Sequence, residues 1–188
     1  GKVYRAKGFD IPEFGRQAKG LPIVNLLNIE QDEVVKEVIA VKPSEEETGH
    51  SERERYLFFI TRDGTVKRSL AQEYFNIRTN GLIAINLKDE DELINVIETD
   101  GHAAIVIGTH EGNATVFPEE EVRVMGRTAT GVRGIKLRST DYVIGGASLA
   151  ANEHVLVVSE KGYGKKTLAE EYSIKHRGGF GVKTANIS

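Results

Sequence analysis

The chain has 188 residues, a net charge of −3, 39% hydrophobic residues, and neither cysteine nor tryptophan. No apolar run is long enough for a membrane-spanning helix, the first residues lack the order of a signal peptide, and disulfides and thiolate metal sites are excluded. We therefore expect a cytoplasmic protein with a buried core, and the negative net charge argues against a uniformly basic surface.

The chain repeats one unit. Four glycines open similar strands: GLPIVNLL at Gly20, GLIAINL at Gly81, GVRGIKL at Gly131 and GVKTANI at Gly181. They lie 61, 50 and 50 residues apart, and the first interval contains an acidic loop insertion at 43–55. Without about ten residues of this insertion the period is near 50 throughout.

A second set of glycines keeps the same register. It precedes the first set by 19, 17, 19 and 19 residues and comprises Gly1, Gly64, Gly112 and Gly162. Glycine at matched offsets is needed where a turn has a positive φ or where two backbones approach closely. Both sets together indicate a true structural repeat.

Within each repeat, short apolar runs rich in β-branched and aromatic residues predict strands. Three of them are YLFFIT at 56–61, HAAIVIGT at 102–109 and HVLVVSE at 154–160. A further strand is expected before each, at 34–41, 93–99 and 142–149, with a tight turn at Asp100–Gly101. Only 69–74 and 167–172 look helical, and both predict a single turn in a connection. Each unit then has about four strands in a row.

Four-stranded antiparallel units of about 50 residues predict an all-β partial β-propeller or β-pinwheel, because one such sheet must stack on its neighbours to bury both faces. A solenoid of helical pairs fits poorly. We expect a single repeat domain over 1–188, with approximate units 1–63, 64–111, 112–161 and an incomplete unit 162–188. Incomplete units at both ends predict a fragment of a longer array that forms an open crescent or exchanges strands between its ends.

The charge is unevenly distributed. Residues 30–54 hold nine acidic and three basic residues, a balance of −6, so the rest of the chain carries +3. Basic residues recur at equivalent positions of the repeat, before the first set of glycines and after the second. They are Arg16, Lys19, Arg78, Arg127, Lys175 and Arg177 in the first group, and Lys67, Arg68, Lys165 and Lys166 in the second. In stacked blades these positions would form a basic belt around the rim, a track for a phosphate backbone. The alternative is that they are ordinary solvated surface charges.

Several segments carry a family resemblance. GRQAKGLPIVNLL (15–27), TRDGTVKR (61–68), GLIAINL (81–87), VRVMGRTATGVRGIKL (122–137) and KGYGKKT (161–167) resemble the C-terminal DNA-wrapping domain of the DNA gyrase A protein. The corresponding domain of topoisomerase IV is a near neighbour. The resemblance extends over essentially the whole chain.

This resemblance implies a β-pinwheel, six-bladed in the full gyrase domain, whose basic rim bends and wraps double-stranded DNA without reading its bases. It also implies a bacterial, chromosome-associated protein whose partners are DNA, the gyrase B protein and the rest of the gyrase A protein. Negative supercoiling would be the work of the parent ATP-dependent isomerase, with ATP and Mg²⁺ on other domains and no cofactor or metal in this chain. Arg133 resembles a further rim contact.

The gyrase A protein has a hallmark seven-residue box for wrapping: Gln, Arg or Lys, Arg, Gly, Gly, Arg or Lys, Gly. The nearest stretch here keeps the arginine at the third position and the three glycines, but has Lys for Gln, His at the second position and Phe at the sixth. It reads Lys175, His176, Arg177, Gly178, Gly179, Phe180, Gly181. We interpret this box-like loop as a degenerate equivalent of the box; its glycines alone are equally compatible with a tight loop.

Other motifs are weaker. GYGKKT (162–167) lacks the leading glycine and final hydroxyl of a phosphate-binding P-loop, and no histidines share a metal-ligand spacing. Tyr56 opens an apolar strand and fits a core residue better than a DNA-cleaving tyrosine, and the acidic run 89–92 fits a solvated turn better than an Mg²⁺ site. The insertion at 43–55 is either an unstructured loop or a competitor of DNA for the rim.

The sequence thus predicts an accessory domain that binds and bends duplex DNA non-specifically within a type II topoisomerase, with no catalytic site in this chain. Two alternatives remain open: a protein-interaction propeller with an incidental basic rim, and a topoisomerase IV-type DNA-binding domain.

Overall fold

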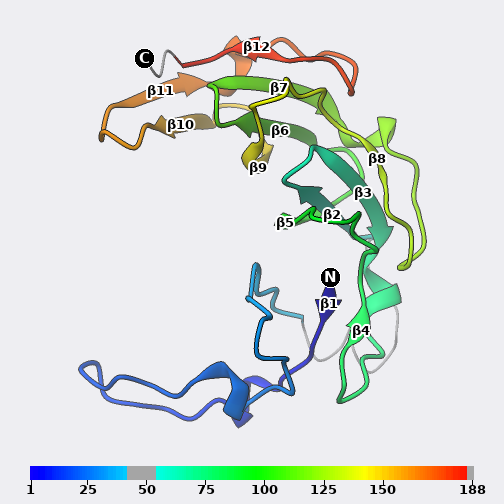
Figure 1. The fold of residues 1–188 in the computed structure, drawn as a ribbon, viewed down its shortest axis with the longest axis vertical. Helices are drawn as coiled ribbons and strands as arrows, with labels where there is room; N and C mark the ends of the chain where they lie inside the picture. Colours follow the sequence, from blue (N-terminus) through cyan, green and yellow to red (C-terminus); the bar gives the residue numbers. More distant parts are fainter. Residues whose placement is uncertain (42–53, 186–188) are drawn as a thin grey trace.

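The computed structural model describes residues 1–41 and 54–185, so all but the last two residues of the acidic insertion expected at 43–55 lie outside the described residues. The described chain forms an open crescent (Figure 1). Its strands are β1 (Lys2–Val3), β2 (Tyr56–Thr61), β3 (Thr65–Leu70), β4 (Leu82–Ile83), β5 (Leu93–Thr99), β6 (Ala104–Thr109), β7 (Asn113–Pro118), β8 (Val132–Arg133), β9 (Val143–Leu149), β10 (His154–Val158), β11 (Gly164–Leu168) and β12 (Val182–Lys183).

Helical structure in the described residues is limited to single 3-10 turns. They are η1 (Gly8–Asp10), η2 (Ile23–Asn25), η3 (Ala71–Tyr74), η4 (Glu119–Glu121) and η5 (Ala169–Glu171). The two predicted helical stretches are confirmed as the turns η3 and η5, and η4 occupies the same place in the repeat between them. None of the turns found in this part of the chain approaches the length that a membrane-crossing helix requires.

Two four-stranded antiparallel sheets form the middle of the crescent. From the concave to the convex side their strand orders are β5-β2-β3-β8 and β9-β6-β7-β12 (Figure 1). The pairs β1-β4 and β10-β11 form smaller sheets at the two ends. The predicted all-β, propeller-like architecture is confirmed.

Counted from one hairpin to the next, each full sheet combines three strands of one repeat with one outer strand of the following repeat. The outer strand β8 follows β7 in the chain but pairs with β3, at Thr65↔Arg133, and β12 pairs with β7 in the same way. The inner strands β5 and β9 pair backwards with β2 and β6. The two complete units, 64–111 and 112–161, each contain four consecutive strands as expected, but those four strands do not form one sheet. The expected unit limits at 63, 111 and 161 fall within the turns of the three hairpins.

Gly131 and Gly181 allow this exchange of outer strands. Gly131 has φ +113°, and a Cβ there would lie 2.4 Å from the Val66 carbonyl oxygen. Gly181 has φ +73°, and a Cβ there would lie 2.6 Å from the Ala114 carbonyl oxygen. No side chain fits between backbones this close. The interpretation of these two glycines as close-approach positions is confirmed.

The three hairpin turns share one hydrogen-bond arrangement. In the first, the Gly64 N–H donates to the Thr61 carbonyl at 3.0 Å, and the Thr65 N–H donates to Thr61 Oγ1 at 3.2 Å. Thr109 and Ser159 accept the corresponding bonds in the other two turns. A hydroxyl residue three positions before the glycine therefore closes each turn.

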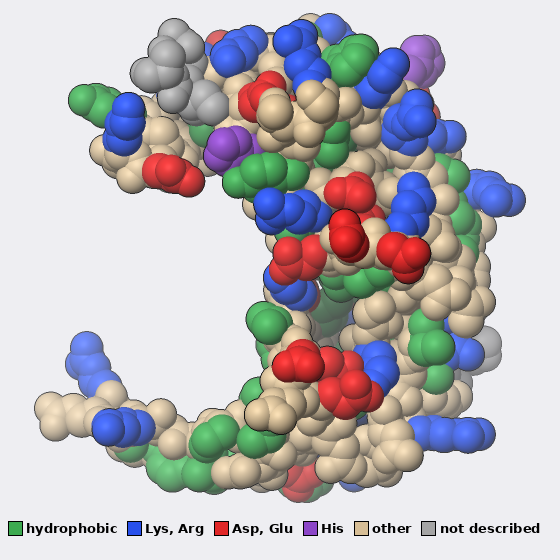
Figure 2. Space-filling view, viewed as in Figure 1, with side chains coloured by type: hydrophobic (Ala, Val, Ile, Leu, Met, Phe, Trp, Pro, Cys, Tyr) green, Lys and Arg blue, Asp and Glu red, His purple; other side chains and the backbone are tan. Residues whose placement is uncertain are grey.

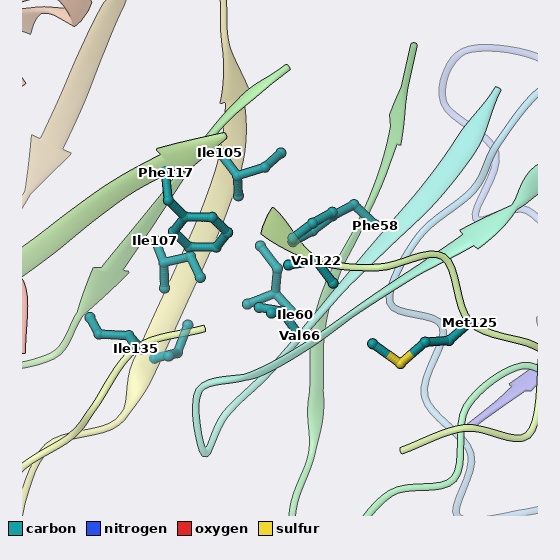
Figure 3. Close-up of a cluster of buried hydrophobic side chains, with 10 residues drawn as sticks. Phe58, Ile60, Val66, Ile105, Ile107, Phe117, Val122, Met125 and Ile135 are labelled. Atoms are coloured by element: carbon teal, nitrogen blue, oxygen red, sulfur yellow. The ribbon is translucent and has the colours of Figure 1, made fainter. Parts of the chain in front are cut away.

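The main core lies between the two four-stranded sheets (Figure 3). Phe58 and Ile60 on β2 face Ile105 and Ile107 on β6, and Phe117 lies 6.3 Å from Phe58 between ring centres. All of these side chains are fully buried. This cluster joins the two sheets, and both of them contribute to it.

The alternate residues of the same strands face the opposite way. Leu57 and Phe59 on β2 pack with Tyr74 and Ile85 in a second cluster, and Val106 on β6 packs with Tyr172 in a third. Successive side chains in a strand point to opposite faces, so a strand covered on both faces becomes an unbroken apolar run. This explains the sequence YLFFIT.

Residues 34–41 are described and do not form the expected strand, and GLPIVNLL at 20–27 forms the turn η2 in place of a strand. In the other repeats the equivalent inner strand pairs back with the preceding hairpin, but among the described strands only the two-residue β1 precedes 34–41. Val34 and Val38 are accordingly 72% and 82% exposed. Without a partner strand, the apolar pattern alone does not produce a sheet.

The strand exchange can be tested at Gly131. We expect Gly131→Ala to lower the free energy of unfolding by about 2 kcal/mol or more, because the new Cβ is placed against the Val66 carbonyl in an unfavourable φ region. Urea denaturation followed by circular dichroism measures this change. Gly126→Ala is the control, since its Cβ would meet nothing within 4 Å. Equal stability of the two variants would contradict the assignment.

Candidate nucleic-acid interface

The loops that lead into the outer strands carry exposed basic residues. Arg78 is exposed in the loop before β4, Arg127 is half-buried before β8, and Lys175 is exposed before β12. Arg133 is exposed on β8 itself. Figure 2 shows Lys and Arg side chains along the convex edge, with Asp and Glu gathered toward the concave side. Arg127, Arg133 and Lys175 thus lie on or beside the outermost strands β8 and β12, and Arg78 lies before β4, which pairs with β1.

A recurring glutamate anchors the basic loops before β8 and β12. Glu73 in η3 accepts a hydrogen bond from the Arg127 N–H at 3.1 Å, and Glu121 in η4 accepts one from the Arg177 N–H at 2.8 Å. Both glutamates occupy the third position of their turn. The Arg177 N–H lowers the pKa of the Glu121 carboxyl, which keeps the acceptor charged. Each loop is therefore anchored to the preceding blade.

The box-like loop lies against the preceding repeat. Arg177 donates through Nε to the Glu121 carbonyl at 3.0 Å and through Nη1 to the Arg133 carbonyl at 2.9 Å. The Gly178 N–H donates to the Gly134 carbonyl at 2.6 Å, and Gly179 accepts a bond from the backbone of Lys136. Two nitrogens of the Arg177 guanidinium, Nε and Nη1, therefore hold the loop in position.

The rest of this loop is more open. His176 is exposed, and its Nδ1 lies 2.7 Å from Glu121 Oε1. Lys175, Gly179 and Phe180 are exposed, whereas Gly178 and Gly181 are half-buried. The loop thus presents the Lys175 cation and an aromatic ring to solvent.

Lys67 does not belong to the belt. Its side chain is fully buried, and Nζ donates to the Ala84 and Arg127 carbonyls, both at 2.5 Å, and to the Tyr74 hydroxyl at 3.3 Å. Burial lowers its pKa to about 8. It connects β3 to two other segments inside the protein, which corrects its assignment as a DNA contact.

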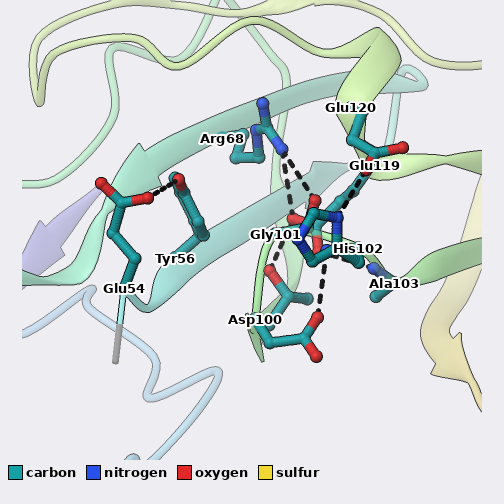
Figure 4. A network of polar contacts seen from close by, with 10 residues as sticks. Glu54, Tyr56, Arg68, Asp100, Gly101, His102, Ala103, Glu119 and Glu120 are labelled. Carbon is teal, nitrogen blue, oxygen red and sulfur yellow. Dashed lines mark hydrogen bonds and ion pairs between the residues drawn. The ribbon is translucent and has the colours of Figure 1, made fainter. Parts of the chain in front are cut away.

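Arg68 is also internal (Figure 4). Its Nη1 lies 3.7 Å from Oε2 of the fully buried Glu119, and its guanidinium lies over the Tyr56 ring at 4.9 Å. Glu119 also accepts bonds from the Thr99 hydroxyl at 2.7 Å and the Ala103 N–H at 2.9 Å. The prediction that Arg68 faces DNA is corrected for the same reason as that for Lys67.

The next repeat explains why these positions are covered. Its segment at Val124 bridges to Arg68, and the Met125 N–H donates to the Arg68 carbonyl at 2.7 Å. Lys165 and Lys166 hold the equivalent positions on β11 and are exposed, because β11 has no outer strand in the described residues. The same position of the repeat is therefore buried where the next repeat covers it and exposed where no outer strand does.

Arg16 and Lys19 are exposed in the N-terminal segment, between η1 and η2. Figure 1 places this segment at the opposite end of the crescent from β12. The structure does not bring these two residues together with the loops around β8 and β12.

Three basic residues near the convex edge were missed. Lys88 and Arg138 each follow a strand-opening glycine by seven residues, Gly81 and Gly131 respectively, and Lys136 lies two residues before Arg138. All three are exposed. The equal offset is a signal that an alignment of the repeats would have revealed.

Comparison with known proteins agrees with this architecture. The family described as "DNA gyrase C-terminal domain, beta-propeller" matches residues 1–42, 55–100, 103–149 and 153–188. The chain belongs to this family. The last three matched segments each begin just before a hairpin, in agreement with the sheets described above.

Relatives and solved structures point the same way. The chain is 46% identical over its whole length to the DNA gyrase A protein of Staphylococcus aureus strain NCTC 8325, of which it spans 21%. A crystal structure of the C-terminal domain of DNA topoisomerase IV matches with TM-score 0.78 and 32% identity, over 87% of this chain and 49% of that one. A DNA gyrase A C-terminal domain matches with TM-score 0.74 and 26% identity, over 96% and 56% respectively.

Burial of Lys67 makes stability depend on pH. Between pH 8 and 10 the folded protein releases the Lys67 proton while the unfolded chain still holds it, so the free energy of unfolding rises with pH. Relative to a Lys67→Met variant, we expect wild type to gain about 2 kcal/mol over this range. Chemical denaturation at several pH values measures the difference. The exposed Lys161, changed to Met, is the control, and parallel profiles for wild type and Lys67→Met would contradict a buried charge.

Proposed function

We propose that this domain binds duplex DNA along its convex edge and bends it, as an accessory part of a type II topoisomerase of the gyrase kind. Strand cleavage, ATP and Mg²⁺ use would belong to the rest of the gyrase A protein and to the gyrase B protein. The supporting observation is the row of basic loops before β4, β8 and β12, which contains Arg78, Arg127 and Lys175. Family membership supports the same proposal.

The anchoring of the loops favours a phosphate track. Glu73 and Glu121 bind backbone N–H groups of the loops before β8 and β12, so the backbone paths of these two loops are fixed before any ligand arrives. A loop whose backbone is already ordered loses less conformational entropy on binding. Contacts to phosphates carry no base information, so the proposed binding is independent of sequence and depends on salt and DNA deformability.

A protein-interaction propeller and a topoisomerase IV-type domain are the competing functions. A polypeptide partner would depend less on salt than DNA does, because DNA binding releases counterions. If about six phosphates are neutralised, the slope of log affinity against log salt is near −5. Fluorescence anisotropy with labelled duplex DNA at several salt concentrations measures this slope.

Neutralising the edge should weaken binding. We expect the triple variant Arg78→Gln, Arg127→Gln, Lys175→Gln to bind duplex DNA more weakly, with a salt slope shallower by about 3. The control, Lys7→Gln, Lys36→Gln, Lys161→Gln, removes the same charge outside these loops. An equal loss of DNA affinity in both triple variants would show a general effect of charge. It would contradict a specific binding path along the convex edge.

Bending with a preferred hand is measurable separately. A nicked plasmid sealed by ligase in the presence of the protein should show a dose-dependent change in linking number. The triple variant at the edge should reduce this change. Duplex binding without any change in linking number would contradict wrapping by this chain, and absence of binding would favour the protein-interaction alternative.

A further inference from the structure

An open hollow of about 490 Å³ lies at the junction of two repeats. The turn between β2 and β3 forms one side, and the segment that follows β8 forms the other. Charged side chains dominate its lining: Lys88, Arg133, Lys136, Arg138, Asp63 and Asp141. Because β8 is the outermost strand of its sheet, the hollow lies toward the convex edge.

The electrostatics of the hollow favour an anion. Four cations face two carboxylates, whereas the whole chain carries a net charge of −3. Asp141 is already engaged, since its Oδ1 accepts hydrogen bonds from the Glu111 N–H at 2.9 Å and the Tyr142 N–H at 3.0 Å. Asp63 is exposed to solvent, which screens its charge. The hollow is thus a local positive site on a negatively charged protein.

An aromatic ring of the box-like loop supports two of these cations. Lys136 Nζ lies 4.7 Å from the centre of the Phe180 ring, and the Arg138 guanidinium carbon lies 6.0 Å from it. Cation–π attraction of this kind contributes about 0.5–1 kcal/mol at exposed sites. The Lys136 N–H also donates to the Gly179 carbonyl at 2.8 Å, which joins the two repeats here. Phe180, 47% exposed, therefore keeps Lys136 and Arg138 together at the surface.

The site is continuous with the proposed track. Arg133 lines the hollow, and its carbonyl accepts the hydrogen bond from Arg177 in the box-like loop. A DNA backbone that passes the loops before β8 and β12 would therefore pass the hollow between them. Phosphates are the anionic groups that such a backbone presents at regular intervals.

We propose that this hollow binds a phosphate of the DNA backbone, through Lys136 and Arg138 as they are held over Phe180. This inference rests on the proposed function and assigns it a specific contact between two blades. Phe180 occupies the sixth position of the box-like loop, and the two cations from the preceding repeat provide positive charge beside it. A free polyphosphate offers the same chemistry, so the experiment separates the two sources.

The test measures duplex affinity of the whole chain by fluorescence anisotropy at several salt concentrations. We expect Lys136→Gln, Arg138→Gln to bind about tenfold more weakly, with a salt slope shallower by about 2. Lys7→Gln, Lys161→Gln is the charge-matched control, and it should change both quantities less. Circular dichroism and thermal denaturation establish that each variant is folded.

Phe180→Leu tests separately whether the Phe180 ring supports Lys136 and Arg138. The substitution keeps the charge and an apolar side chain but removes the ring. We expect it to weaken binding about threefold in the wild-type background, a loss of the size expected for an exposed cation–π contact. In the Lys136→Gln, Arg138→Gln background it should have no further effect. An equal effect in both backgrounds would show that Phe180 acts independently of the two cations and overturn their coupling.

The failures are distinguishable. The first outcome is that the Lys136→Gln, Arg138→Gln variant binds DNA like wild type while the Arg78, Arg127, Lys175 variant binds more weakly. DNA binding along the convex edge is then supported, and the proposal for the hollow is wrong. If wild type itself does not bind duplex DNA, the proposed function fails, and this proposal fails with it. If tripolyphosphate binds wild type but not the hollow variant, and DNA affinity is unchanged, the hollow is a site for free polyphosphate and the DNA assignment is overturned.

Discussion

The exchange of outer strands between repeats is the constraint on which this structure depends. β8 leaves its own repeat to pair with β3, and β12 pairs with β7. Gly131 and Gly181 permit the backbone contacts that this requires. Each sheet is completed by the repeat that follows, so neighbouring blades are joined by backbone hydrogen bonds in addition to the apolar core between them. The blades therefore cannot separate without the loss of a strand.

The same exchange determines where the basic loops lie. The chain must cross to the outer edge of the preceding sheet before it forms β8 or β12, so the loops that carry Arg127 and Arg177 run along the convex side. Glu73 and Glu121 then bind those loops to the preceding blade. One topological feature thus produces both the stacking of the blades and the convex edge at which DNA binding is proposed.

This arrangement gathers basic side chains on the convex edge, and the net charge of the chain does not predict that distribution. The chain is negative overall, yet the convex edge and the hollow beside Phe180 are basic. Two of the strongest basic signals in the sequence, Lys67 and Arg68, lie inside the protein, where they bind carbonyl groups and Glu119. Buried cations retained with partners of this kind are strongly coupled to their surroundings, since removing one partner leaves an unpaired polar group.

Much of the fold was determined by sequence alone. Glycine spacing and the runs at 56–61, 93–99 and 142–149 identified the repeat and its strands, because backbone conformation and two-sided burial leave local patterns. Pairing between repeats, the lack of a strand at 34–41, and the burial of Lys67 beside the exposure of Lys165 were decided only by tertiary structure. These depend on which segment lies next to a strand, and identical positions of a repeat differ in their neighbours. The support of Lys136 and Arg138 by Phe180, more than forty residues away, is likewise a contact that only the exchanged strands bring about.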